Sequence, residues 1–449
     1  MYELSGRRVL VVGLARSGVA AAKLCAREGA KVTVTDKRKA AELERQVAEL
    51  LPLGVRFELG GHDVASFTSA DLIVCSPGVP LANAEFVEAR RAGVPVIGEV
   101  ELAASFVGEP IVGITGTNGK STTTALVGHL LAQSGLRVFT GGNLGTPLAE
   151  RVLAGGELDV SVVELSSYQL EAVERFRAHV AVLTNLTPDH LDRYPSAEAY
   201  YQAKRAIFRG QTADDYAILN AGDEKTLRLH AGARSLPLTF GHGPAQDCAA
   251  RDDGSRIVVR LPGGSDESYE TLGRTLRGRH NRENAMAAIV AARLAGASES
   301  AVREGLTTFP GLPHRLEIVR THGGVEWIND SKATNVDSTT VALQALAGPV
   351  IWIAGGLGKG APYAPLRPLL AGRVKALLTI GADAATIEAE LGDVVQVTRC
   401  ETLERAVEHA RGLAASGDQV LLSPACASFD QFESYGHRGG VFRALVEAL

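Results

Sequence analysis

The segment from residue 113 to 122, GITGTNGKST, combines glycines, a lysine and hydroxyl side chains in the order that a phosphate-binding loop requires. In such a loop the backbone amides of the turn and of the following helix surround phosphate groups, Lys120 reaches the terminal phosphates and Ser121 can ligate Mg²⁺. Ile114 stands where the strict GxxxxGK[ST] pattern has its first glycine. A chance glycine turn is the alternative, but strand, loop and helix follow in register, so we expect ATP or GTP binding. The contacting residues are expected to be Gly116, Thr117, Asn118, Gly119, Lys120, Ser121 and Thr122.

Acidic and imidazole side chains follow two further predicted strands. Glu164 ends the strand Val160–Glu164, and the strand Val180–Asn185 leads into NLTPDHLD, which contains His190 and ends at Asp192. Because the carboxyl ends of parallel strands lie at one edge of a sheet, both groups should face the phosphate loop. Glu164 and His190 could there hold a divalent cation that bridges ATP phosphates. A single strand-end carboxylate often caps a helix instead, but the two clusters together favour a metal site.

The segment Gly13–Gly18 lies between a predicted strand and a predicted helix, and Asp36 ends the next strand. This spacing matches a dinucleotide-binding fingerprint with alanine at the middle glycine position. Three interpretations stay open: a dehydrogenase, a nucleotide-sugar site, or a strand–helix turn that only packs tightly. Lys37 and Arg38 add positive charge that suits an anionic ligand, although such side chains are usually solvated surface. Lys204, on a later amphipathic helix, is interpreted from the pattern alone as a solvated side chain.

Four loops in the last third of the chain carry polar groups at a domain edge or after predicted strands. A loop with both a carboxylate and a lysine, such as Asp330 and Lys332, could approach ATP from the side opposite to the phosphate loop. Each loop alone could equally be an ordinary strand–helix turn. The four loops are His314–Arg315, Asn329–Asn335, Gly355–Gly360 and Ser423–Gln431.

Short apolar runs alternate with helical stretches throughout the chain, which predicts parallel sheets covered on both faces by helices. We therefore expect an α/β protein of three domains, comprising residues 1–99, 100–310 and 311–449. Val100–Pro110 reads as a linker between the first two. A β-hairpin is expected near residues 256–264, and an alanine-rich helix over Asn284–Leu294.

The composition excludes several classes of protein. With 46 basic and 51 acidic residues among 449, the chain is mildly acidic and has no basic stripe of the kind that binds nucleic acid. Five scattered cysteines without CxxC spacing suit a reducing compartment and argue against disulfides or a thiolate zinc site. The N-terminus predicts a strand instead of a signal peptide, and no apolar run approaches the roughly 20 residues that span a bilayer. We expect a cytoplasmic protein without a nucleic-acid or membrane partner.

Taken together, these motifs resemble the Mur ligase superfamily, and specifically its D-glutamate-adding branch, over nearly the whole chain. GTNGKST at Gly116–Thr122 is shared by the superfamily. NDSKATN at Asn329–Asn335 is the most telling segment, because the alanine- and diamino-acid-adding relatives differ there. The other segments similar to the D-glutamate branch are GGNLG at Gly141–Gly145, ELSSYQLE at Glu164–Glu171, DHLDRYP at Asp189–Pro195, GRHNRENA at Gly278–Ala285, GLPHR at Gly311–Arg315 and SPACASFDQF at Ser423–Phe432.

The resemblance implies Rossmann-like N-terminal and C-terminal domains around a central P-loop ATPase-like domain. It implies a monomeric ligase that uses ATP and two Mg²⁺ ions to join D-glutamate to UDP-N-acetylmuramoyl-L-alanine in peptidoglycan precursor synthesis. The substrate carboxylate attacks the γ-phosphate of ATP. The amine of D-glutamate then attacks the acyl phosphate through a tetrahedral intermediate and expels phosphate. Positioning and charge neutralisation do most of the work in such chemistry.

The resemblance also assigns roles to individual residues. The expected catalytic residues are Lys120, His190, Lys204 and Lys332, and the expected metal ligands are Ser121, Glu164, His190 and Lys204, the last carbamylated by CO₂. Further ATP contacts are Asn284 at the adenine, Asp330 at the ribose, and Arg315 and Lys332 at the terminal phosphate. The uridine diphosphate is expected to meet Arg16, Ser17, Lys37 and Gly78, and the muramoyl-alanine end to meet Asn143 and His190. The D-glutamate carboxylates are expected at Thr334, Lys359, Ser428 and Tyr435. Leu357 departs from the pattern, because some members have an aspartate there.

Three competing functions can be weighed on the sequence. Another ligase of the superfamily, such as a folylpolyglutamate synthase or a different Mur ligase, would differ at NDSKATN and in the N-terminal domain. A nicotinamide-dependent dehydrogenase would leave the phosphate loop unexplained. A non-catalytic, ATP-gated binding protein is disfavoured because Glu164, His190 and Lys332 are retained.

Overall fold

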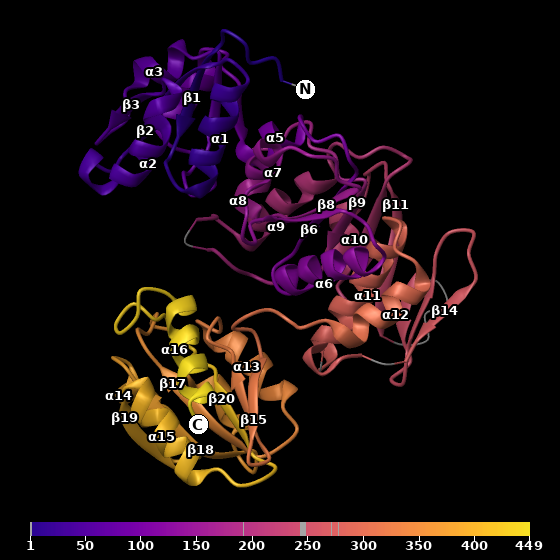
Figure 1. The fold of residues 1–449 in the computed structure, drawn as a ribbon, viewed down its shortest axis with the longest axis vertical. Helices are drawn as coiled ribbons and strands as arrows, with labels where there is room; N and C mark the ends of the chain where they lie inside the picture. The colour runs from indigo at the N-terminus through magenta and orange to yellow at the C-terminus, as the bar shows by residue number, and fades with distance from the viewer. Residues whose placement is uncertain (1, 192, 243–247, 271, 277) are drawn as a thin grey trace. The chain divides into compact units, whose positions relative to one another are not determined.

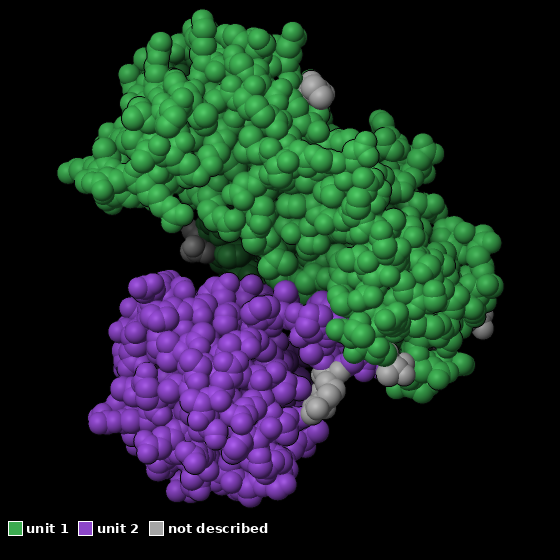
Figure 2. Space-filling model, in the orientation of Figure 1, with its two compact units in different colours: residues 1–271, 283–308 green, residues 272–282, 309–449 purple. Residues whose placement is uncertain are grey.

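The computed structural model describes residues 2–191, 193–242, 248–270, 272–276 and 278–449. Its strands form three separate sheets. The chain divides into two compact units, shown in Figure 2. Unit 1 comprises residues 1–271 and 283–308 and contains the first two sheets, whereas unit 2 comprises residues 272–282 and 309–449 and contains the third.

The N-terminal sheet is parallel and has five strands in the order β3-β2-β1-β4-β5. Apolar residues from Val9 to Val12 make both faces of β1 buried: Val9 and Val11 join one core cluster, whereas Leu10 and Val12 join another. The strands are β1 (Arg8–Val12), β2 (Lys31–Asp36), β3 (Arg56–Leu59), β4 (Leu72–Cys75) and β5 (Val96–Gly98). The helices between them are α1 (Arg16–Arg27), α2 (Glu44–Leu50), α3 (Val64–Ser69) and α4 (Ala84–Arg91).

The central sheet has nine strands in the order β14-β13-β12-β11-β10-β9-β6-β8-β7. It is parallel from β7 to β12, and β13 and β14 add the antiparallel hairpin that the sequence predicts. β6, which precedes the phosphate loop, lies between β8 and β9 in this sheet. Figure 1 labels these three strands in the central part of the chain. The strands are β6 (Ile111–Thr115), β7 (Val138–Gly142), β8 (Val160–Glu164), β9 (Val180–Leu183), β10 (Tyr216–Asn220), β11 (Leu236–His242), β12 (Ala250–Asp252), β13 (Ile257–Arg260) and β14 (Asp266–Tyr269).

Eight helices accompany the central sheet in the described residues. The first half of the expected linker Val100–Pro110 is helical, because Glu99–Ala104 forms the buried helix α5, so the expectation of a linker was wrong there. Ser196 caps α9, with its hydroxyl accepting the N–H of Ala199 at 3.2 Å. The other helices are α6 (Lys120–Gln133), α7 (Leu148–Ala154), α8 (Ser167–Leu170), α9 (Ala197–Arg205), α10 (Glu224–His230), α11 (Arg279–Leu294) and α12 (Glu299–Thr308).

The C-terminal sheet has the order β15-β16-β20-β17-β18-β19, with β15 antiparallel to β16 and the remaining pairs parallel. Alternate residues of β17 again enter two cores, one on each face of the sheet. The strands are β15 (Glu317–His322), β16 (Val325–Asn329), β17 (Val350–Gly355), β18 (Val374–Ile380), β19 (Val397–Glu401) and β20 (Gln419–Leu422). The helices are α13 (Val336–Ala345), α14 (Ala384–Leu391), α15 (Leu403–Leu413) and α16 (Tyr435–Glu447). Single 3₁₀ turns cover Ala40–Glu42, Leu51–Leu53, Ala206–Phe208 and Arg274–Leu276, and a longer one covers Ala364–Leu369.

All five cysteines are buried and none forms a disulfide. Burial raises the pKa of the Cys25 and Cys75 thiols to about 12 and that of Cys426 to about 11. Within the described ranges, no helix is long and apolar enough to cross a membrane.

Candidate active site

The phosphate loop between β6 and α6 requires glycine at two positions. Gly116 has φ 146° and Gly119 has φ 84°, both in the region that side chains disfavour. A Cβ on Gly116 would lie 2.0 Å from the Thr184 hydroxyl oxygen, and a Cβ on Gly119 would lie 2.2 Å from Asn284 Oδ1. The loop can therefore pass this closely to its neighbours only without side chains at these two positions.

The segment that follows β9 holds the first half of this loop in place. Thr117 N donates to Asn185 O, and Asn118 N donates to Asn185 Oδ1, both at 2.9 Å. The Thr184 hydroxyl donates to Asn118 O at 2.6 Å. The amides of the next residues, in the first turn of α6, have no acceptor within the helix and are suited to phosphate oxygens.

The Lys120 side chain folds back onto the phosphate loop and binds two of its carbonyl groups. Its Nζ donates to Gly116 O at 3.0 Å and to Thr117 O at 2.7 Å, and the residue is half-buried. Ser121, next in sequence, is buried at the start of α6. The ammonium group of Lys120 thus lies against the carbonyl groups of the loop, where it can neutralise a phosphate bound to the helix amides.

Glu164 ends β8 beside the phosphate loop and is almost completely buried. Asn143 donates from Nδ2 to Glu164 Oε1 at 2.6 Å, so the structure brings these two predicted residues together. Among the described residues, nothing hydrogen-bonds the other carboxylate oxygen, Oε2, which is also buried. A buried carboxylate oxygen without a partner is costly unless a cation or a donor binds it, and this fits a divalent metal.

His190 lies on an exposed loop after β9 and has φ 54°, which is rare for a residue other than glycine. Its Nδ1 lies 2.9 Å from the Tyr168 hydroxyl, and its Nε2 lies 3.6 Å from Asp189 Oδ2. Asp192 lies outside the described residues. The described part of the chain contains no group of three or more His, Cys, Asp or Glu side chains arranged for a metal ion.

Lys204 of α9 is buried, with 1% of its surface exposed, and its Nζ lies 4.6 Å from the centre of the Tyr200 ring. Burial, and then the charge of Lys120, lower the pKa of Lys204 well below its ordinary value, although Asp189 and Glu164 act in the opposite direction. The interpretation of Lys204 as a solvated side chain was therefore wrong. Local periodicity could not show that α9 turns this position inward.

The N-terminal glycine motif forms a tightly packed turn. Gly13 has φ 91°, and a Cβ on Gly18 would lie 1.8 Å from Gly13 O. Asp36 accepts the N–H of Leu14 at 2.8 Å and pairs with the Arg38 guanidinium, also at 2.8 Å. Burial opposes its ionisation, but these hydrogen bonds lower the pKa of Asp36 to about 2. Both carboxylate oxygens of Asp36 are thus hydrogen-bonded within the protein. In a dinucleotide fingerprint the acid at this position instead binds the ribose of the ligand.

The residues expected at the uridine diphosphate lie on or beside the carboxyl-end loops of β1, β2 and β4. Arg16 is exposed, and its guanidinium lies 3.7 Å from Glu150 Oε2 of α7. Arg193, from the loop after β9, donates to Pro77 O at 3.2 Å and so reaches the loop that carries Gly78. Of the other predicted contacts, Ser17 is half-buried, whereas Lys37 and Gly78 are exposed.

In unit 2, Asp330 follows β16 and is buried. It accepts the Ser423 hydroxyl at 2.8 Å and the N–H of Leu316 at 3.2 Å, so it ties together the loops after β16 and β20. Burial raises the pKa of Asp330 to about 7 despite these bonds. Nearby, Arg315 Nε is buried and has no hydrogen-bond partner among the described residues. The Lys332 ammonium lies 5.6 Å from the centre of the Tyr435 ring.

The structure brings together two of the residues expected at D-glutamate. Lys359 Nζ donates to the Thr334 hydroxyl at 3.3 Å. Ser428 is buried after β20, and Tyr435 begins α16 partly exposed. Leu357 is exposed, but Asp383 lies under the same loop, because a Cβ on Gly358 would be 2.1 Å from Asp383 Oδ2.

Arg438 of α16 is a residue that the motifs did not reveal. It is completely buried and donates to the Ser331 hydroxyl and carbonyl, at 3.0 and 2.9 Å. It also donates to the carbonyls of Cys426 and Ala427. Burial lowers the pKa of Arg438 to about 10. The arginine thereby joins two of the loops that were singled out from the sequence, and only its position in the fold reveals this.

The chain has three sheets covered by helices, and its phosphate loop lies beside a buried carboxylate oxygen that has no partner among the described residues. These features define a nucleotide-binding enzyme of the α/β class. Three protein-family models identify the family to which the chain belongs. Residues 7–98 match the Mur ligase MurD-like N-terminal domain, residues 114–292 the Mur ligase middle domain, and residues 314–426 the Mur ligase glutamate ligase domain. The chain belongs to the Mur ligase family.

Its curated relatives match along their whole length. A UDP-N-acetylmuramoylalanine--D-glutamate ligase of Anaeromyxobacter dehalogenans is 59% identical, with 99% of this chain and 98% of the relative covered. The Myxococcus xanthus protein of the same name is 51% identical, with 99% of each covered. Among solved structures, MurC of Thermotoga maritima has a TM-score of 0.60 at 20% identity, covering 98% of this chain and 99% of that one. A MurF of Acinetobacter baumannii has a TM-score of 0.63 at 19% identity, covering 93% and 91%. At these identities the two structures show the fold alone.

Proposed function

We propose that this chain joins D-glutamate to UDP-N-acetylmuramoyl-L-alanine, at the expense of ATP, in peptidoglycan precursor synthesis. The observation that carries the proposal is the phosphate loop with Lys120 at its mouth, beside Glu164, whose Oε2 is buried and unpartnered. This is the arrangement that a reaction between two anions, a carboxylate and ATP, requires. The name shared by the full-length relatives supplies the substrates.

The proposed reaction has two steps. A carboxylate oxygen of the L-alanyl group attacks the γ-phosphorus of ATP, the bond to the β–γ bridging oxygen breaks, and an acyl phosphate and ADP result. The neutral amine of D-glutamate then attacks the acyl carbon, loses a proton, and expels inorganic phosphate. Lys120 neutralises negative charge on the phosphoryl group in the first step, and Asn143 orients the muramoyl-alanine end.

The residues fit Mg²⁺ beside the phosphate loop. Glu164 would hold it through Oε2, with Ser121 and His190 as the further ligands that we propose. Bound there, Mg²⁺ would neutralise phosphate charge and orient the reacting oxygens. These side chains offer few oxygens compared with the six that Mg²⁺ prefers, so a further anionic ligand is expected.

Lys204 is our candidate for that ligand, as a carbamate formed from CO₂. The amine nitrogen attacks CO₂ and loses a proton, which gives an anionic group with two oxygens. The reaction needs the neutral amine, and the lowered pKa of the buried Lys204 supplies it. The positive charge of Lys120 would favour the anionic product.

The remaining contacts stay proposals on the same basis. ATP is assigned to the loop Gly116–Thr122 with Asn284, Arg315, Asp330 and Lys332. The uridine diphosphate is assigned to Arg16, Ser17, Lys37 and Gly78, and D-glutamate to Thr334, Lys359, Ser428 and Tyr435. The domain boundaries 1–99, 100–310 and 311–449 and a monomeric enzyme complete the proposal.

An assay of ADP release tests the proposal. The purified chain is given UDP-N-acetylmuramoyl-L-alanine, ATP and Mg²⁺ together with one member of a panel of D- and L-amino acids. We expect ADP only when the sugar nucleotide and D-glutamate are both present. Turnover with L-glutamate or with a folate substrate in place of these would assign the chain to another ligase of the family.

A further inference from the structure

A cavity of about 490 Å³ lies in unit 1 at the edge of the central sheet opposite to the phosphate loop. It is lined by Ile111, which begins β6, and by His179, which precedes β9, whereas the phosphate loop follows the other end of β6. Tyr2 and the segment after α5 complete the wall. Its volume is within the range of pockets that hold small organic ligands.

The two carboxylates in the wall are already saturated. Glu101 accepts the backbone N–H groups of Glu174, Arg175 and Phe176 at 2.8–3.1 Å, and also the Tyr2 hydroxyl at 3.0 Å. Glu109 accepts the Ser161 hydroxyl at 2.5 Å and two N–H groups of Arg151. Neither carboxylate needs a cation from a ligand. Glu109 already pairs with Arg151, whereas Glu101 keeps its negative charge on a wall that also carries two arginines.

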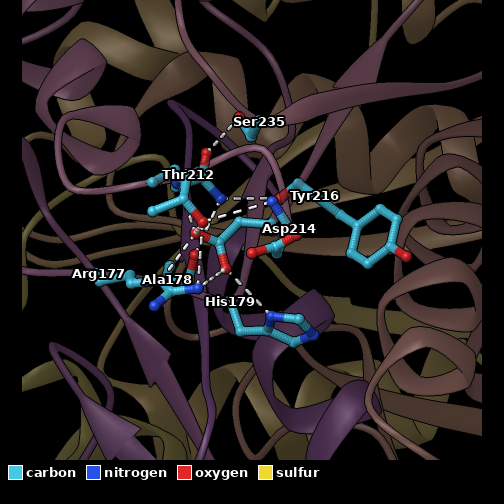
Figure 3. Close-up of polar contacts among 9 residues, drawn as sticks. Arg177, Ala178, His179, Thr212, Asp214, Tyr216 and Ser235 are labelled. Carbon is cyan, nitrogen blue, oxygen red and sulfur yellow. Dashed lines mark hydrogen bonds and ion pairs between the residues drawn. The ribbon is translucent and has the colours of Figure 1, made fainter.

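The cations in the wall are less completely compensated. Arg175 is exposed, its guanidinium lies 5.8 Å from the centre of the Tyr2 ring, and it forms no ion pair among the described residues. Arg177 and His179 share a single carboxylate, that of the buried Asp215, at 2.8 and 3.1 Å. Figure 3 shows Arg177 and His179 near Thr212, whose hydroxyl accepts a hydrogen bond from the Arg177 guanidinium at 3.2 Å. Arg177 keeps half of its side chain exposed.

We propose that this cavity binds a small organic phosphate. The Arg175 guanidinium offers a planar fork of N–H donors to a phosphate dianion. Arg177 already binds Asp215 through Nε and Nη2, so it would add its Nη1 donor and its positive charge. The wall below them is apolar, with Phe176 and Ile111, so the organic part of the ligand would lie there. Neither the phosphate loop nor any residue assigned to substrate takes part, so this is a second site.

Calorimetric titration of the full chain with phenyl phosphate tests the site. We expect one phenyl phosphate bound outside the phosphate loop, so that Lys120→Ala leaves this binding unchanged. Arg175→Ala should weaken it at least about tenfold, whereas Arg175→Lys should recover part of the loss. Ala104→Phe, which fills the cavity without changing its charge, should weaken binding similarly. Arg256→Ala, at an arginine that does not line the cavity, controls for the loss of one positive charge.

Several results would overturn the site. Binding abolished by Lys120→Ala would place the phosphate in the catalytic loop. Unchanged affinity in Arg175→Ala, an equal loss in Arg256→Ala, or no binding to the wild-type chain at millimolar phenyl phosphate would each refute it. Melting temperatures of the free variants separate a lost site from a lost fold, and Arg175→Ala, at an exposed side chain, is the variant that should melt as the wild type does.

Discussion

Glu99 begins α5, and its side chain is completely buried. One oxygen, Oε1, accepts the N–H of Ala149 at 2.6 Å, whereas Oε2 has no hydrogen-bond partner among the described residues. Burial raises the pKa of Glu99 to about 7 from its ordinary 4.5; the Ala149 N–H opposes this and the charge of Glu150 adds to it. The folded chain therefore favours the neutral acid.

This pKa makes the stability of the fold fall as the pH rises. Between pH 4.5 and 7 the folded chain retains a proton that the unfolded chain has released, so the free energy of unfolding decreases across this window. The difference between about 7 and 4.5, at about 1.36 kcal/mol for each pH unit, corresponds to roughly 3 kcal/mol. Glu99→Gln keeps the shape and removes the charge. It should raise the free energy of unfolding by up to this amount at about pH 8 and by little below pH 4.5.

Urea unfolding of the full chain, followed by far-ultraviolet circular dichroism at several pH values, measures this effect. Both tryptophans, Trp327 and Trp352, belong to unit 2, so their fluorescence follows the other unit as an internal reference. Glu101→Gln is the matched control on the same helix. Because Glu101 accepts three backbone N–H groups and a hydroxyl, its amide should destabilise the fold by about 1–3 kcal/mol. A Glu99→Gln variant that is less stable at pH 8, or whose gain does not change with pH, would refute the reasoning.

Four further substitutions bear on the site. Lys120→Ala should lower ADP release by at least about 100-fold at an unchanged melting temperature, because the phosphoryl charge loses its cation; near-normal turnover would contradict the assignment. Lys204→Ala should be nearly inactive and partly rescued by formate or acetate, and normal turnover in CO₂-depleted buffer would exclude a carbamate. Lys359→Ala should reduce the preference for D-glutamate over D-alanine, measured as the ratio of kcat/KM values, and an unchanged ratio would remove Lys359 from the pocket. Gly116→Ala, whose Cβ would lie 2.0 Å from the Thr184 hydroxyl, should lose ADP binding in calorimetry, and wild-type affinity would show that the loop can adapt.

The sequence predicted the parts of the site that depend on local order. The phosphate loop, the carboxylate of Glu164 at the end of β8 and the loop of His190 after β9 follow from strand–loop–helix order and from the neighbourhood of β6, β8 and β9. Their ligand roles stay predictions. Family resemblance added the candidates that have no local signature, and Lys204 is the clearest of these.

Features that depend on packing between distant segments were not predictable. The burial of Lys204 arises because α9 packs inward, and a single lysine on an amphipathic helix does not reveal which side it occupies. Asp36 had the spacing of a ribose-binding acid, yet Arg38, two residues later, takes its carboxylate. Arg438 contacts loops 12 and 107 residues away in the chain, beyond the reach of any periodicity.

The burial of all five thiols also bears on how the molecule can be handled. A thiolate is the form that reacts with alkylating and oxidising reagents, and the raised pKa values of Cys25, Cys75 and Cys426 keep these thiols protonated at neutral pH. The native chain should therefore accept little maleimide label. One cysteine introduced in each unit would then carry a pair of fluorophores with little background, so that energy transfer could follow the distance between the units during turnover without replacement of the natural cysteines.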